Sequence, residues 1–227
     1  METHEIDDAL TRAEEAVRSG AGLGGTGFWR AVGEVKADAA LVDSYADRIA
    51  EIDRQAFENW GPLIALPLGV GTLLAVLMTG VGVFLVGLAY YLDGFVAIVV
   101  FGAGVAVLLG STHGLAHLVV GLILGIRFTK WFVPEITQPQ PGVKIDYVSY
   151  LHTPPRRRAW MHASGALVTK AIPFLMVPAA LAAGLPDWVW WVLVIAGVAM
   201  VVTDVFWSTK ASDWKRYRRE MALAQDS

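Results

Sequence analysis

Hydrophobic residues divide the chain into an amphipathic N-terminal region and a strongly apolar remainder. Four apolar stretches follow residue 60, and each is long enough for the ~20 residues that a helix needs to cross a bilayer. We expect these spans over 63–91, 95–126, 159–183 and 188–208, with a tight turn after the first span and another after the third. The pattern therefore predicts an all-α polytopic membrane protein with about four transmembrane helices.

Residues 1–60 form a separate region in which apolar positions recur at helical spacing. A first amphipathic helix over 4–18 is predicted by four such residues, Ile6, Leu10, Ala13 and Val17. The glycine-rich stretch 20–27 ends it, and apolar residues at seven-residue intervals predict a second helix over 28–58. We expect an N-terminal amphipathic helical hairpin that packs on itself or on the membrane domain. A homodimer formed through these helices and a substrate-docking arm are the alternatives.

The polar segment between the second and third spans carries two strand-like stretches. Residues 128–136 and 143–150 favour strands, and the turn-rich stretch 138–142 separates them. We predict a small β-hairpin here. Its edge could pair with an extended peptide by strand addition, and a plain connector is the alternative.

Basic residues indicate how the spans are oriented. The two tight turns carry none, whereas the loop 127–158 carries six and the segment 210–227 carries five. The positive-inside rule therefore places the loop, its hairpin and both termini in the cytoplasm. We expect an integral protein of a bacterial or archaeal cytoplasmic membrane. Its predicted domains are a cytoplasmic helical region at 1–60, a four-span membrane domain at 61–209 and a basic cytoplasmic tail at 210–227.

Composition narrows the chemistry. The 227 residues are 55% hydrophobic and carry a formal net charge of −3, which argues against a nucleic-acid partner. The sequence has no cysteine, so disulfides, thiolate metal ligands and cysteine nucleophiles are excluded. Histidine and carboxylate remain as metal ligands. The expected partners are the lipid bilayer and a membrane protein or transmembrane peptide.

Polar residues inside the predicted spans form the candidate site, because such residues are costly in hydrocarbon. His113 and His117 lie four positions apart on one helix face, a spacing that suits a single metal ion. Asp204 lies at a similar depth in the fourth span and completes a two-histidine, one-carboxylate set like that of catalytic zinc sites. Zinc is therefore the predicted cofactor, although iron, cobalt or manganese would accept these ligands. Lys170 lies deep in the third span, and we expect it to pair with Asp204 or Asp93.

The run His113-Gly114-Leu115-Ala116-His117, followed by Leu124-Gly125-Ile126-Arg127, resembles the metal-binding helix of the site-2 protease family. These are intramembrane zinc metalloproteases. The loop hairpin, the stretch 154–167 and Asp204 resemble further family features in the same order, so that the resemblance covers about residues 95–213. It implies that the two histidines and Asp204 bind zinc, which activates a water to cleave a membrane-embedded peptide.

Gly114 departs from the family pattern, in which a glutamate directly after the first histidine is the general base. Acid–base catalysis typically contributes about 10²–10⁴-fold, so the protein needs a substitute if it is an enzyme. Lys170 and His162 are the candidate catalytic residues for surrogate proton transfer, with Glu135 and His152 as further candidates in the loop. A glycine leaves room beside the metal, and we expect a glutamate introduced there to create or raise peptidase activity.

Three functions from different classes stay open. The first is an active but divergent intramembrane zinc metalloprotease. The second is a catalytically inactive pseudoprotease that binds membrane helices as a regulator. The third is a haem-binding membrane protein in which His113 or His117 serves with His162 as an axial ligand.

Overall fold

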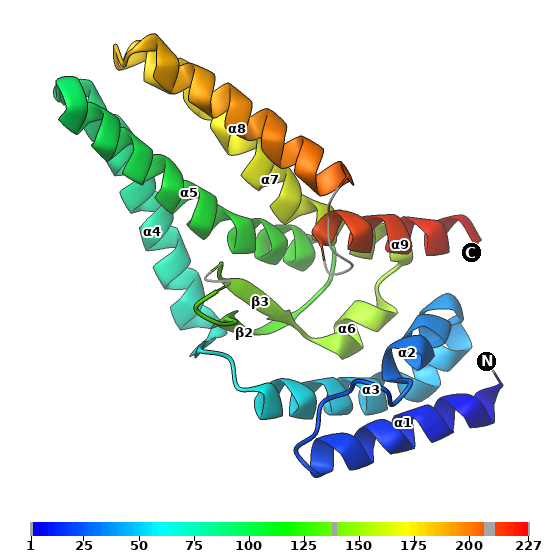
Figure 1. Ribbon diagram of the computed structural model, residues 1–227. Coiled ribbons are helices and arrows are strands. Elements are labelled where there is room, and N and C mark those ends of the chain that lie inside the picture. The colour runs from blue at the N-terminus through cyan, green and yellow to red at the C-terminus, as the bar shows by residue number, and fades with distance from the viewer. Residues whose placement is uncertain (1, 138–139, 207–211, 227) are drawn as a thin grey trace.

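The computed structural model describes residues 2–137, 140–206 and 212–226, and its long helices project as two hairpins from a smaller helical and β-sheet region (Figure 1). Within this part of the chain, four helices are long and apolar enough to cross a membrane: Leu68–Tyr91, Gly94–Ile123, Pro155–Ala182 and Asp187–Asp204. The prediction of a membrane protein with four spans is confirmed. The predicted end of the fourth span at Ser208 and the domain boundary after residue 209 lie outside the described residues.

The two hairpins pack through their middle helices. The first consists of α4 (Leu68–Leu88), a single 3₁₀ turn (Ala89–Tyr91) and α5 (Gly94–Ile123), and the second of α7 (Pro155–Ala182) and α8 (Asp187–Phe206). Helix α5 packs against both α4 and α7. Small residues bring α4 and α5 together, because a Cβ atom on Gly104 would lie only 2.9 Å from the carbonyl oxygen of Gly82.

The N-terminal region is a bundle of three helices, α1 (Thr3–Arg18), α2 (Phe28–Ala37) and α3 (Ala39–Trp60). Its core contains the predicted apolar face of α1 together with residues of α2 and α3, including Ile6, Leu10, Phe28, Val35 and Ile49. The prediction of one helix over 28–58 is wrong. Asp38 has an extended backbone, and its carboxylate accepts a hydrogen bond from the backbone N–H of Ala40, so a new helix begins there.

A three-stranded antiparallel sheet lies between the bundle and the spans, in the order β1 (Ile64–Pro67), β2 (Phe128–Val133) and β3 (Gly142–Ile145). Strands β2 and β3 form the expected pair, whereas β1 consists of residues for which the sequence predicts the start of the first span. The predicted strand over 143–150 ends early. Asp146 caps the short helix α6 (Tyr147–His152) by accepting a hydrogen bond from the backbone N–H of Ser149.

The last described element is helix α9 (Asp213–Asp226), which packs against α7. The ring of Tyr217 on α9 meets that of Trp160 on α7 edge to face, with centroids 5.7 Å apart. Figure 1 shows both termini at the same end of the molecule, away from the turns of the two long hairpins. The segment predicted as a basic tail is thus a docked helix, and its docking determines where Asp213 lies.

Candidate metal centre

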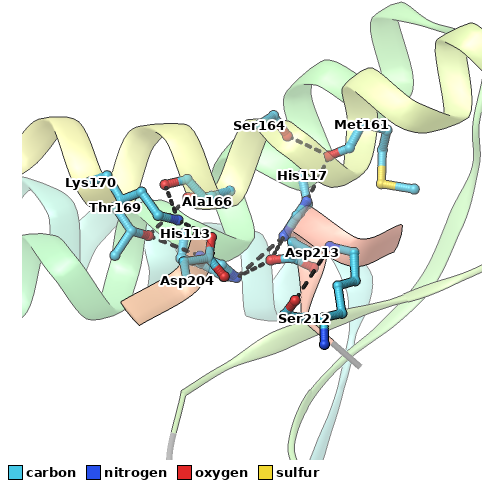
Figure 2. A network of polar contacts seen from close by, with 12 residues as sticks. His113, His117, Met161, Ser164, Ala166, Thr169, Lys170, Asp204, Ser212 and Asp213 are labelled. Atoms are coloured by element: carbon cyan, nitrogen blue, oxygen red, sulfur yellow. Dashed lines mark hydrogen bonds and ion pairs between the residues drawn. The ribbon is translucent and has the colours of Figure 1, made fainter. Parts of the chain in front are cut away.

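Two histidines of α5 and the first residue of α9 meet at one point (Figure 2). The Nε2 atoms of His113 and His117 are 3.3 Å apart. One carboxylate oxygen of Asp213 lies 3.3 Å from Nε2 of His113 and 3.2 Å from Nε2 of His117. The predicted histidine pair therefore shares one face, as its spacing requires.

Hydrogen bonds on the far side of each ring set the imidazole tautomers. Nδ1 of His117 lies 2.8 Å from the carbonyl oxygen of Met161, which can only accept. Nδ1 of His113 lies 2.9 Å from Oγ1 of Thr169, whose own proton is donated to the carbonyl oxygen of Gly165. Both Nδ1 atoms are therefore assigned as donors, which leaves a lone pair on Nε2 in each neutral ring.

The resulting arrangement fits a metal ion. With both rings neutral, two imidazole lone pairs and a carboxylate oxygen face one another, and either a bound cation or protons on the imidazoles offset their repulsion. Around tetrahedral zinc, ligands at 2.0–2.2 Å are separated from each other by about 3.3–3.6 Å. The three observed separations, 3.2, 3.3 and 3.3 Å, agree with that spacing. Three protein ligands leave a fourth position for water or substrate.

Asp213 is the candidate ligand that sequence reasoning missed. Burial raises the pKa of its carboxyl. Hydrogen bonds and charge from the two imidazoles lower the pKa by more than burial raises it, so the pKa lies below its ordinary value of 3.8 and the group is ionised. The available signal was the start of a helix. The hydroxyl of Ser212 accepts a hydrogen bond from the backbone N–H of Lys215, and an acidic residue follows directly, as is typical of a helix N-terminus.

Asp204, the predicted third ligand, lies in an ion pair instead. Its carboxylate is 2.6 Å from Nζ of Lys170, which is one of the two pairings expected for that lysine. Nζ of Lys170 also donates to the carbonyl oxygen of Ala166 at 3.3 Å. Because Lys170 follows Thr169, the partner of His113, the ion pair lies next to the histidines without joining them (Figure 2).

His162 belongs to a different polar cluster. Its Nε2 lies 2.8 Å from the hydroxyl of Tyr150, which itself donates to Glu220, so the imidazole is the donor. Both ring nitrogens of His117 are engaged as well. A bis-histidine haem ligation would have to break these contacts, and the geometry does not favour it.

Gly114 and Gly165 are glycines because aromatic rings lie against them. A Cβ atom on Gly114 would lie 2.5 Å from the indole of Trp131, and that indole is fixed by a 3.0 Å hydrogen bond from its Nε1 to Oγ1 of Thr72. The expectation of open room beside Gly114 is therefore wrong. A Cβ atom on Gly165 would lie 2.3 Å from Nε2 of His117, so this glycine lets a metal-binding ring rest on the backbone of α7.

An apolar groove of about 340 Å³ begins at Trp131 and runs between α4, α5 and the sheet. Its walls include residues of β1, both helices and β2, among them Leu66, Met78, Ser111 and Val133. The groove suits an apolar ligand. One of its lining residues, Ser111, lies two positions before His113 on α5.

Comparison with protein-family models, with curated proteins and with solved structures finds no match for this chain.

Proposed function

We propose that this protein is a zinc-binding intramembrane hydrolase of the site-2 protease type, which cleaves a membrane-embedded peptide. The observation that carries the proposal is the convergence of three potential ligand atoms, from His113, His117 and Asp213, at a mutual spacing that fits zinc. The open fourth position distinguishes such a set from a closed structural site.

The chain supplies both ligands and orienting partners. When bound, zinc supplies Lewis acidity and lowers the pKa of a water molecule towards ~7. Met161 and Thr169 hold the two imidazoles by their Nδ1 atoms, as second partners of metal-bound histidines commonly do. The carboxylate of Asp213 adds the one negative charge of the ligand set.

Proton transfer is assigned to the neighbouring ion pair. The carboxylate of Asp204 accepts the proton that the attacking water loses, and Nζ of Lys170 donates a proton to the leaving amine. Transfer of the proton from Asp204 to Lys170, 2.6 Å away, then restores both groups. This pair replaces the family's glutamate, for which Trp131 leaves no room at Gly114.

The groove and the sheet provide a binding surface for the substrate. Among the described residues, strand β1 pairs with β2 on one side and has no strand on the other, so this edge is proposed for strand addition by an unwound peptide. Apolar side chains of such a peptide fit the groove beside β1 and α5. By the positive-inside rule, the sheet, α9 and the N-terminal bundle face the cytoplasm of a bacterial or archaeal cell.

A pseudoprotease is the second candidate, and one observation favours it. The indole of Trp131 fills the position where a general base would stand, so the metal would lack an adjacent carboxylate base. In that case the groove would bind a membrane helix without cutting it.

Metal analysis combined with a cleavage assay tests the proposal. We expect about one zinc per chain in the detergent-purified protein and no visible absorption band, and we expect His117→Ala to lose the zinc. Cleavage of a model transmembrane peptide by the wild type, but not by His117→Ala, supports the hydrolase. Zinc without cleavage supports the pseudoprotease, a Soret band supports haem, and a wild type that binds no zinc overturns the metal centre.

A further inference from the structure

Helix α9 carries two functional carboxylates on one face. Asp213 and Glu220 are seven residues apart, which is two helical turns or about 10.5 Å along the axis. The first contributes to the metal centre, and the second is buried, with only 4% of its surface exposed. Whatever positions Glu220 therefore also positions Asp213.

Three other helices hold Glu220 in place. Nζ of Lys36 on α2 lies 2.6 Å from one carboxylate oxygen, and the hydroxyl of Tyr150 on α6 donates to the same oxygen at 2.9 Å. Nε of Arg158 on α7 lies 2.7 Å from the other oxygen. A buried carboxylate needs such partners, because an unpaired charge in the interior is costly.

Of these partners, Lys36 comes from a separate structural unit. It belongs to the N-terminal bundle, whereas Arg158 lies on a membrane-spanning helix. Lys36 is itself largely buried, with 15% of its side chain exposed, and its ammonium also lies 4.7 Å from the ring centre of Tyr150. The charge of Lys36 thus connects the bundle directly to the helix that begins at Asp213.

Metal sites depend on such connections, because ligands must be held within about 0.5 Å of their productive positions. His113 and His117 are fixed by a long transmembrane helix. Asp213 is the first residue of α9, so the docking of this helix positions it, and Glu220 is the most buried charged group of α9 among the side chains that the structure describes.

We infer that Lys36 and Glu220 are positioning residues for the metal centre, and that the N-terminal bundle regulates metal affinity by holding Asp213 in place through this ion pair. The inference rests on the proposed metal site. It means that any partner or change that moves the bundle away from α9 weakens the third ligand.

A matched pair of variants tests this on the full-length protein. Lys36→Met removes the connection to α9. Lys144→Met removes a similar buried ion pair, between Lys144 on β3 and Asp53 on α3, which also connects the bundle to the rest of the chain but does not include α9. Lys36→Arg keeps the positive charge and should therefore keep the zinc affinity of the wild type.

We expect Lys36→Met to weaken zinc binding by about 10-fold or more, as loss of an orienting partner commonly does. Lys144→Met and Lys36→Arg should bind zinc as the wild type does. Hydrogen exchange measured without zinc should rise in α9 of Lys36→Met while α5 stays protected. Equal zinc affinity in Lys36→Met and the wild type, or equal losses in Lys36→Met and Lys144→Met, overturns the inference. A wild type that binds no zinc overturns the metal site itself, which is a separate result.

Discussion

The carboxylate of Asp204 lies 2.6 Å from the ammonium of Lys170, so the two charges inside the apolar helices α7 and α8 neutralise each other. Each side chain is only 20% exposed. In hydrocarbon, burying such a pair costs far less free energy than burying either charge alone. Pairing therefore accounts for both residues without making Asp204 a metal ligand.

The metal centre predicts different roles for the two aspartates. Asp213→Asn should lose most of the bound zinc, because the amide supplies no negative charge to the ligand set. Asp204→Asn should keep about one zinc per chain. Elemental analysis of both purified variants measures this directly. Loss of zinc from Asp204→Asn, with retention in Asp213→Asn, would restore the assignment made from the sequence.

The ion pair predicts a non-additive effect on stability. Lys170→Met leaves Asp204 unpaired and should lower the free energy of unfolding by about 3 kcal/mol. The double variant Lys170→Met/Asp204→Leu should recover most of that loss, because an apolar pair of similar volume needs no neutralisation. Thermal unfolding of the single and double variants in detergent gives the comparison. Additive losses would mean that the two charges are not coupled.

The spans and the histidine pair could be predicted from the sequence because both depend on local periodicity. Apolar runs determine the helices, and a spacing of four residues places His113 and His117 on one face. The third ligand could not be found in this way. Asp204 lies near the end of the fourth apolar span and Asp213 lies nine positions further along the chain, and only the docking of α9 on α7 shows which of them meets the histidines.

Strand β1 and Trp131 were missed for a similar reason. Residues 64–67 are apolar and read as the start of a span, but they pair with β2, which lies more than sixty positions along the chain. The same pairing places Trp131 opposite Leu66 and against Gly114. The sequence shows that glycine occupies position 114, where the pattern it resembles has glutamate. Only the tertiary contact with Trp131 shows why.

Adding one methyl group at Gly165, as in Gly165→Ala, should lower the affinity of the site for metal. The Cβ atom of Gly165→Ala would meet Nε2 of His117 at 2.3 Å, so the ring must move and zinc affinity should fall about 10-fold. Gly102→Ala is the control, because Gly102 lies on α5 with no atom within 4 Å of its added Cβ. Titration with zinc compares the two. Unchanged affinity in Gly165→Ala would show that His117 does not need this contact.

Glu220 predicts how the stability of α9 depends on pH. Burial raises the pKa of this carboxyl, but Lys36 and Arg158 lower it more, so the pKa lies below its ordinary value of 4.5. A lowered pKa means that the stabilisation is present above 4.5 and is lost as the pH falls through the folded-state value. The melting temperature of the wild type should exceed that of Glu220→Gln at neutral pH, and the difference should vanish in acid. A difference that does not change with pH would show that the charge of Glu220 is not responsible.

We expect that a glutamate introduced at Gly114, as in the family that the sequence resembles, will not by itself give peptidase activity. In Gly114→Glu the Cβ atom would lie 2.5 Å from the indole of Trp131, which is 4% exposed and hydrogen-bonded to Thr72. Overpacking of this kind typically costs about 1–3 kcal/mol, so the variant should melt earlier and gain no peptidase activity. The double variant Gly114→Glu/Trp131→Ala removes the clash and places a carboxylate beside the histidines, but the loss of the buried indole should itself lower the stability by about 3–5 kcal/mol, so cleavage is the informative measurement for this variant. Thermal unfolding and cleavage of a model transmembrane peptide follow the two effects separately. Peptidase activity in the single variant would show that Trp131 moves aside, and that the site tolerates a general base where the native chain has none.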